Sequence, residues 1–138
     1  MTKKECRLLR LDTLTDPRGS LTAIEGGESV PFEINRVFFL HGLTPEQTRG
    51  SHAVRNEQAV VAVQGACSVY THDGRREKTF VLDRPMAALY IPAMVWREIR
   101  PLSEDCLLAV LSDRHYDPDA YVRDFPAFLR LFAEGPDG

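Results

Sequence analysis

The chain of 138 residues is poor in cysteine, and its three cysteines, Cys6, Cys67 and Cys106, lie far apart in the sequence. None of them forms a Cys-x-x-Cys pair, which excludes the common zinc-binding and dithiol redox motifs. An odd number of widely spaced cysteines also argues against a disulfide framework. We therefore expect buried, reduced thiols, as is typical of a cytoplasmic protein.

Long apolar runs and an excess of positive charge are lacking as well. Every apolar run is far shorter than the roughly 20 residues that a membrane-spanning helix needs, and the N-terminal segment 1–10 is charged without the apolar stretch of a signal peptide. Lysine and arginine total 17 against 20 acidic residues, for a net charge of -3. Nucleic acids and anionic membranes attract strongly positive surfaces, so neither is expected as a partner. A small anion held by a few arginines remains compatible with this charge.

What the sequence does contain is a series of short apolar segments separated by turn signals, among them Asp73-Gly74. A turn roughly every 10 residues is typical of antiparallel sandwiches and barrels. Glycine accepts the positive φ of a tight hairpin turn, so Asp73-Gly74 predicts a hairpin. The predicted strands are Arg7–Leu11, Ser20–Glu25, Asn35–His41, Gln58–Val63, Cys67–His72, Lys78–Leu82, Ala87–Ile91, Trp96–Arg100 and Cys106–Ser112.

The pattern changes after the last predicted strand. Asp117 and Pro118 are typical of a helix start, as cap and first helical residue, and Asp124 with Pro126 repeats the pattern. We expect helical turns at about 117–133, with Phe125, Phe128, Leu129 and Phe132 packed on the sheets. Together these elements predict an all-β protein, a cupin-type jelly-roll barrel with a short C-terminal helical segment, as a single domain over residues 1–138.

Many barrels of this type bind a metal through a His-x-His pair, a nearby Glu and a later His, because one ion needs three or four converging ligands. His52 occupies the first position, but Val54 stands two residues later, where strand alternation would place the second ligand. Arg97 stands at the expected position of the later His, and Glu57 is off the usual spacing. We therefore expect neither a metal nor another cofactor.

His52 is the strongest candidate for acid–base chemistry. It follows Arg49 and Gly50, where glycine permits close approach and arginine can bind an anion, and it precedes Glu57-Gln58. A structural hydrogen bond is the alternative for a lone histidine. Four arginines near strand starts or inside strands could hold a phosphate or diphosphate, or form solvated salt bridges: Arg18, Arg36, Arg49 and Arg97. Tyr90 and Trp96 flank Pro92 and could pack in the core or stack on a ligand.

These motifs resemble, in order and spacing, the small cupin family of dTDP-4-keto-6-deoxyhexose 3,4-ketoisomerases, from Asp16 to about Leu131. The matching segments are Asp16-Pro17-Arg18-Gly19-Ser20-Leu21, Val30-Pro31-Phe32-Glu33-Ile34-Asn35-Arg36-Val37-Phe38-Phe39, Arg49-Gly50-Ser51-His52-Ala53, Glu57-Gln58, Gly65, Asp73-Gly74, Leu89-Tyr90-Ile91-Pro92, Val95-Trp96 and Tyr116-Asp117.

The resemblance implies a cytoplasmic, cofactor-independent enzyme of deoxysugar biosynthesis that moves a keto group from C4 to C3 of a dTDP-linked sugar through an enediol. It also implies a homodimer, with N-terminal strands exchanged between subunits. On this interpretation His52 transfers the proton, helped by water or Tyr90. The residues expected to bind the substrate are Arg18, Arg36, Arg49, Gln58, Trp96 and Arg97.

The sequence departs from the family pattern where the chemistry occurs. The family's His-Ala-His pair is His52-Ala53-Val54 here, and Phe38-Phe39 replaces a segment that usually contains a tyrosine. Trp96-Arg97 stands where Trp-His is common, and the interval from His52 to Gly65 is one residue short. Two hypotheses follow: His52 serves alone as proton shuttle, or the chain is a sugar-nucleotide-binding relative with altered, epimerase-like, or lost catalysis.

Overall fold

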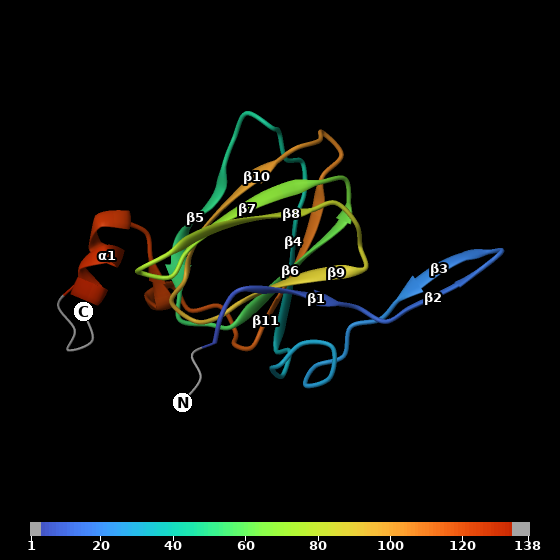
Figure 1. The fold of residues 1–138 in the computed structure, drawn as a ribbon, viewed down its shortest axis with the longest axis horizontal. Coiled ribbons are helices and arrows are strands. Elements are labelled where there is room, and N and C mark those ends of the chain that lie inside the picture. The colour runs from blue at the N-terminus through green and yellow to red at the C-terminus, as the bar shows by residue number, and fades with distance from the viewer. Residues whose placement is uncertain (1–3, 134–138) are drawn as a thin grey trace.

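The computed structural model describes residues 4–133, which form two five-stranded antiparallel sheets facing each other (Figure 1). This confirms the predicted all-β jelly-roll barrel. One sheet contains, in spatial order, β1 (Arg7–Arg10), β9 (Ala87–Ile91), β6 (Gln58–Gln64), β11 (Leu107–Ser112) and β4 (Arg36–Leu40). The other contains β12 (Tyr121–Val122), β5 (Arg49–Val54), β10 (Trp96–Pro101), β7 (Cys67–His72) and β8 (Glu77–Leu82). The predicted domain limits, residues 1 and 138, lie outside the described range.

The main core lies between the two sheets. Leu89 and Ile91 of β9 point inward and meet Leu108 of β11 and Val69 of β7, all buried. Alternate residues of a strand face opposite sides, so Ala88 and Tyr90 point to the outer side of the first sheet. There they lie in a second cluster with Leu11, Val30 and Phe32, which we call the covered face.

The C-terminal turns cover part of the second sheet, as predicted. Asp117 caps a short 3₁₀ turn, Pro118–Ala120, by accepting a 2.9 Å hydrogen bond from the backbone N–H of Asp119. Helix α1 (Phe125–Ala133) follows, and Asp124 accepts a 3.0 Å bond from Ala127 in its first turn. The aromatic side chains of this helix pack over β10, where Trp96 meets Phe125 and Phe128.

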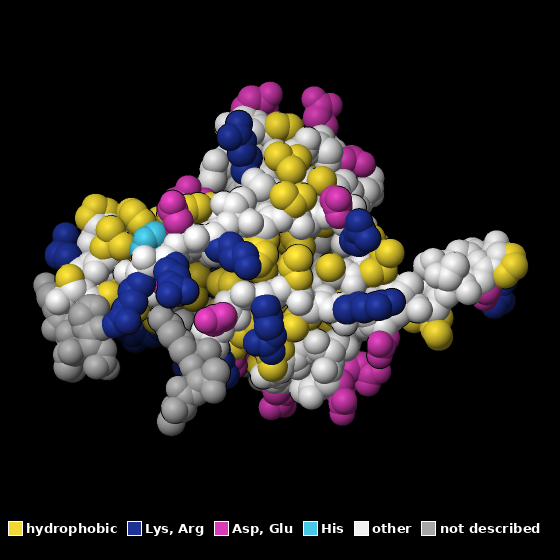
Figure 2. Space-filling model, viewed as in Figure 1, with side chains coloured by type: hydrophobic (Ala, Val, Ile, Leu, Met, Phe, Trp, Pro, Cys, Tyr) yellow, Lys and Arg dark blue, Asp and Glu magenta, His cyan; other side chains and the backbone are white. Residues whose placement is uncertain are grey.

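A separate hairpin of β2 (Thr13–Asp16) and β3 (Gly19–Thr22) stands clear of the barrel (Figure 1). Its cross-strand pair Leu14 and Leu21 is 74% and 61% exposed. Figure 2 shows hydrophobic side chains on the projecting hairpin. Among the described residues, no helix is long and apolar enough to cross a membrane.

Three strands were missed by the sequence patterns: β2, β5 and β12. Strand β5 reads Arg-Gly-Ser-His-Ala-Val, and its first four residues lack the apolar alternation of a strand. Strand β12 has only two residues. Two of the three missed strands, β5 and β12, pair with each other and form one wall of the cavity described next.

Candidate functional site

A cavity of about 430 Å³ opens between the two sheets and is lined by residues of β4, β5, β6, β10, β11 and β12. Its polar lining comes from strands far apart in the sequence, which the barrel brings together. The residues that line it are Arg36, Phe38, Leu40, Thr48, Arg49, Gly50, Ser51, His52, Gln58, Val60, Arg97, Ile99, Val110, Tyr121 and Arg123. The predicted site residues His52, Arg36, Arg49, Gln58 and Arg97 thus meet in one place.

His52 projects from β5 into this cavity and is half-buried. Its backbone position is opposite Arg97 of β10, and its ring meets the ring of Tyr121 edge-on, with 4.9 Å between the ring centroids. Burial, with smaller contributions from the charges of Arg97 and Arg123, lowers the pKa of His52 to about 3. The imidazole is therefore neutral at pH 7, the form that can accept a proton.

Gly50 bends β5 just before His52. Its φ is +74°, a conformation that L side chains rarely adopt. The bend lies beside Arg97 and Ile99, which a Cβ at this position would contact at ordinary distances. The glycine is required by its backbone angle rather than by lack of space.

Four arginines surround the histidine: Arg36, Arg49, Arg97 and Arg123. Within residues 4–133, none of their guanidinium groups is within ion-pairing distance of a carboxylate, and no acidic residue lines the cavity. Arg36 lies over the rings of Phe38 and Tyr116, at 4.3 and 5.1 Å from their centroids. A cavity with this positive charge, in a chain of net charge -3, selects for an anion.

Arg97 is the most constrained of the four. Only 2% exposed, it donates a 2.7 Å hydrogen bond from Nη1 to Gln58 Oε1 and a 3.2 Å bond from Nε to the Val95 carbonyl. Its Nη2 has no partner among the described residues. Burial lowers the pKa of Arg97 to about 10, so the side chain stays charged at pH 7. A buried cation with one free donor is poorly satisfied, and an anionic ligand would satisfy it.

Three predicted site residues are not brought to this cavity. Tyr90 is fully buried on the covered face and donates its hydroxyl to Glu57. Trp96 lies beneath α1 and donates a 2.8 Å hydrogen bond to Glu98. Arg18 is on the projecting hairpin, paired with Asp16 at 2.8 Å.

The sequence patterns missed the lining tyrosine, Tyr121, and one of the lining arginines, Arg123. They stand two apart, so an extended backbone places them on one side, and β12 pairs with β5 to bring Tyr121 opposite Val54. The i, i+2 spacing of Tyr and Arg in Tyr-Val-Arg could have indicated that both side chains face the same way. The helix-start patterns on either side predicted helical turns there instead of a two-residue strand.

The metal chemistry of some cupins does not fit the residues present. The cavity offers one imidazole and four guanidinium groups, and the positions for two further histidine ligands carry Val54 and Arg97. Cations repel a metal ion, and three or four ligands are needed to hold one. No cluster of metal-ligating side chains occurs within the described residues.

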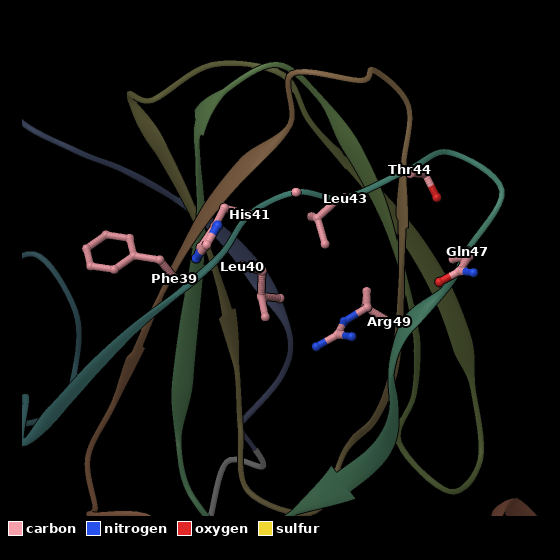
Figure 3. A pocket seen from close by; sticks show the side chains of 8 residues that line it. Phe39, Leu40, His41, Leu43, Thr44, Gln47 and Arg49 are labelled. Carbon is pink, nitrogen blue, oxygen red and sulfur yellow. The ribbon is translucent and has the colours of Figure 1, made fainter.

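A neighbouring hollow of about 340 Å³ extends the cavity past Arg49, which lines both spaces (Figure 3). It is lined by Phe39, Leu40, His41, Gly42, Leu43, Thr44, Gln47 and Arg49. Figure 3 shows Arg49 pointing across from β5 toward Leu40, whereas Phe39 points away from it. Arg49 therefore lies at the boundary between the two spaces.

The barrel and this cavity define a small cupin built around one histidine and a cluster of arginines. The family model described as FdtA: WxcM-like, C-terminal matches residues 4–133. The chain belongs to this family, that of the dTDP-sugar 3,4-ketoisomerases.

Named relatives show how close the likeness is. A TDP-4-oxo-6-deoxy-alpha-D-glucose-3,4-oxoisomerase from Aneurinibacillus thermoaerophilus is 35% identical over 131 residues, 94% of each chain. A 3,4-ketoisomerase structure from Helicobacter canadensis matches with TM-score 0.91 and 35% identity, over 96% of this chain and 100% of the other. The WlaRB TDP-quinovose 3,4-ketoisomerase from Campylobacter jejuni matches with TM-score 0.87 and 40% identity, over 93% and 99%.

Proposed function

We propose that the chain is a 3,4-ketoisomerase of a dTDP-linked 4-keto-6-deoxyhexose. The observation that carries the proposal is the cavity itself, where the neutral His52 lies among four arginines with no carboxylate of residues 4–133 within ion-pairing distance. The names of the relatives, which are TDP-sugar ketoisomerases at 35% to 40% identity over almost the whole chain, support the same reaction.

The proposed binding mode follows from the arginines. A diphosphate carries two negative charges and many acceptor oxygens, which guanidinium groups bind through paired hydrogen bonds. Arg97 Nη2 has no hydrogen-bond partner among the described residues and is available to donate to a phosphate oxygen, while Nη1 donates to Gln58 Oε1. Arg36, Arg49 and Arg123 provide the remaining positive charge, and the hollow beyond Arg49 gives room for the nucleoside.

The proposed catalytic base is His52. In a 4-keto sugar, the carbonyl at C4 acidifies the hydrogen on C3, and its removal gives an enediolate. Nearby cations stabilise the oxyanion that forms. The imidazolium then returns its proton to C4, so one base serves both adjacent carbons.

We also infer that the protein works as a homodimer in which the β2–β3 hairpin of one copy packs on the other. An isolated two-stranded ribbon is marginally stable in water, and this one exposes Leu14 and Leu21 side by side. Arg18 lies in the turn of this hairpin, so in such a dimer its side chain would be placed to reach the cavity of the partner copy. The cytoplasmic location implied by the resemblance stays a prediction.

The dimer has a direct test. Leu14→Glu with Leu21→Glu should shift sedimentation of the chain from dimer to monomer. If Arg18 acts across the dimer, mixed dimers of Arg18→Ala and His52→Asn chains should regain activity that neither chain has alone. A wild-type chain that sediments as a monomer would contradict this part of the proposal.

The central experiment follows the C3 hydrogen by proton NMR in heavy water, with dTDP-4-keto-6-deoxyglucose as substrate. We expect loss of the C3 signal and growth of a 3-keto product. His52→Asn should slow both by at least about 100-fold while dTDP binding, measured by calorimetry, is kept. His115→Asn is the matched control, because His115 is exposed and does not line the cavity.

The same experiment separates the alternatives. Binding of dTDP without deuterium uptake would indicate a binding protein. Exchange at C3 with the ketone retained at C4 would indicate an epimerase. Failure to bind dTDP would contradict the proposed ligand class altogether.

A further inference from the structure

The phenol of Tyr121 stands beside His52 and has no part in the function proposed above. Its ring centroid is 4.9 Å from that of His52, and both side chains line the cavity. In the β5–β12 ladder Tyr121 is directly opposite Val54, two residues from His52. Residues directly opposed in an antiparallel pair share a face of the sheet, so the phenol occupies the side of β5 where Val54 offers no chemistry.

Positive charge surrounds this phenol. Arg36 donates a long hydrogen bond, 3.5 Å from Nη1 to the Tyr121 hydroxyl oxygen, and the guanidinium of Arg123 lies 4.6 Å from the centre of its ring. The charge of Arg97 also interacts with Tyr121. Among residues 4–133, no acidic side chain lines the cavity, so the charged groups around the Tyr121 hydroxyl are all cationic.

A keto shift needs two kinds of proton transfer. One proton leaves C3 and one arrives at C4, and these are adjacent carbons that one imidazole can serve. A second proton must leave the hydroxyl oxygen on C3 while another arrives at the oxygen on C4. We propose that Tyr121 carries this oxygen-bound proton, as the second catalytic residue of the site, an inference that rests on the proposed function.

The steps balance as follows. His52 takes the proton from C3, the C–H electron pair forms the C3–C4 double bond, and the C4 oxygen takes the phenolic proton of Tyr121. The enediol now lies between an imidazolium and a phenolate. The phenolate then takes the proton from the C3 hydroxyl, a C3 carbonyl forms, and C4 takes the proton from the imidazolium. C3 is oxidised, C4 is reduced, and both side chains are restored.

This pairing also removes an electrostatic difficulty. Burial and the arginines disfavour an imidazolium at His52, so a histidine that gained a proton alone would add a fifth positive charge to the site. A phenolate formed at the neighbouring ring cancels that charge. The total charge of the site therefore stays constant through the reaction.

Tyr121→Phe tests the assignment, because it removes the hydroxyl and leaves the ring. With dTDP-4-keto-6-deoxyglucose in heavy water, we expect formation of the 3-keto product to fall by at least about 100-fold. Deuterium uptake at C3, which His52 performs, should fall by less than about tenfold. The ratio of exchange to isomerisation therefore rises, whereas a merely structural role would lower both equally. Affinity for dTDP, measured by calorimetry, should be unchanged.

Tyr116→Phe is the matched control. Its ring lies 5.9 Å from that of Tyr121, but Tyr116 is 56% exposed and does not line the cavity, so neither rate should change. If Tyr121→Phe isomerises at the wild-type rate, or loses exchange and isomerisation in parallel, the assignment is overturned while the ketoisomerase function stands. A wild-type chain that binds dTDP but forms no 3-keto sugar overturns both.

Discussion

Two tyrosines, the fully buried Tyr90 and the partly buried Tyr121, lie on opposite sides of the first sheet, and they differ in the charges that surround their hydroxyl groups. On the covered face, Tyr90 donates its hydroxyl to Glu57, and burial followed by that carboxylate raises the pKa of the phenol. In the cavity, Tyr121 instead accepts from Arg36 and lies beside a neutral histidine. The phenol of Tyr90 thus lies beside an anion, whereas the phenol of Tyr121 lies among cations.

The comparison extends to the two regions as wholes. The covered face satisfies its polar groups, since Glu57 also pairs with Lys4 at 2.6 Å. The cavity leaves Arg97 Nη2 without a partner among the described residues. Unsatisfied buried charge costs stability and is kept where a ligand completes it. Changes in the cavity should therefore act on binding and catalysis, and changes on the covered face on stability.

The largest effect is expected from Arg97→Met. Loss of a buried, charged hydrogen-bond donor should weaken dTDP binding by roughly 100-fold, about 3 kcal/mol. The free energy of unfolding should stay the same or rise, because an incompletely paired buried cation is replaced by an apolar side chain. Calorimetry and urea unfolding measure the two quantities. Arg100→Met, an exposed position on the same strand, is the control.

The opposite result would contradict the expected difference between the cavity and the covered face. If Arg97→Met destabilises the fold and leaves dTDP binding intact, the guanidinium is a structural element and the cavity is not its ligand site.

Two glycines with similar backbone angles sharpen the comparison. Gly50 in β5 has φ +74°, and Gly27, in the loop over the covered face, has φ +77°. Alanine at either position should cost about 1–2 kcal/mol of unfolding free energy from backbone strain. Only Gly50→Ala should also reduce ketoisomerase activity, by roughly tenfold, because it shifts His52. Equal losses of activity in both variants would show that strain anywhere in the barrel disturbs the site.

The contrast between these regions also shows what the sequence could predict. Turn signals and apolar segments predicted nine of the strands, and Cys67–His72 and Ala87–Ile91 agree with the structure at both ends. The helical caps at Asp117 and Asp124 were predicted as well. Local chemistry sets these features, so a single sequence is enough to find them.

The facing of side chains was harder to predict. Trp96 and Arg97 were both assigned to the substrate, yet neighbouring residues of a strand point to opposite faces, and only Arg97 reaches the cavity. Strand β9 is apolar on both sides, so alternation could not reveal that Tyr90 points outward. Tyr121 became visible only through pairing with β5, a contact between residues far apart in the sequence.

A smaller effect is expected from Tyr90→Phe on the covered face. Loss of its hydrogen bond to Glu57 should lower the free energy of unfolding by about 1 kcal/mol. The rate of ketoisomerisation should not change, since Tyr90 does not line the cavity. Urea unfolding and the NMR assay give the two values. A strong loss of activity in this variant, with the free energy of unfolding preserved, would show that Tyr90 takes part in catalysis.

The smallest effect is the pH dependence of stability, which should differ in direction between the two regions. The pKa of His52 is about 3 in the fold against about 6.5 unfolded, so its contribution is complete above pH 6.5 and is lost as the pH falls. Between pH 7 and 6 the loss is below about 1 kcal/mol, and His52→Asn should remove it. Tyr90 has a raised pKa, so its contribution to the free energy of unfolding is complete below pH 10 and is lost above that. The Tyr90→Phe variant should remove this alkaline loss and leave the acid one.

A bound diphosphate should raise the pKa of His52, because its negative charge offsets the charges of Arg97 and Arg123. Binding of dTDP should therefore weaken the dependence of stability on acid pH. If dTDP leaves that dependence unchanged, the diphosphate does not lie beside His52.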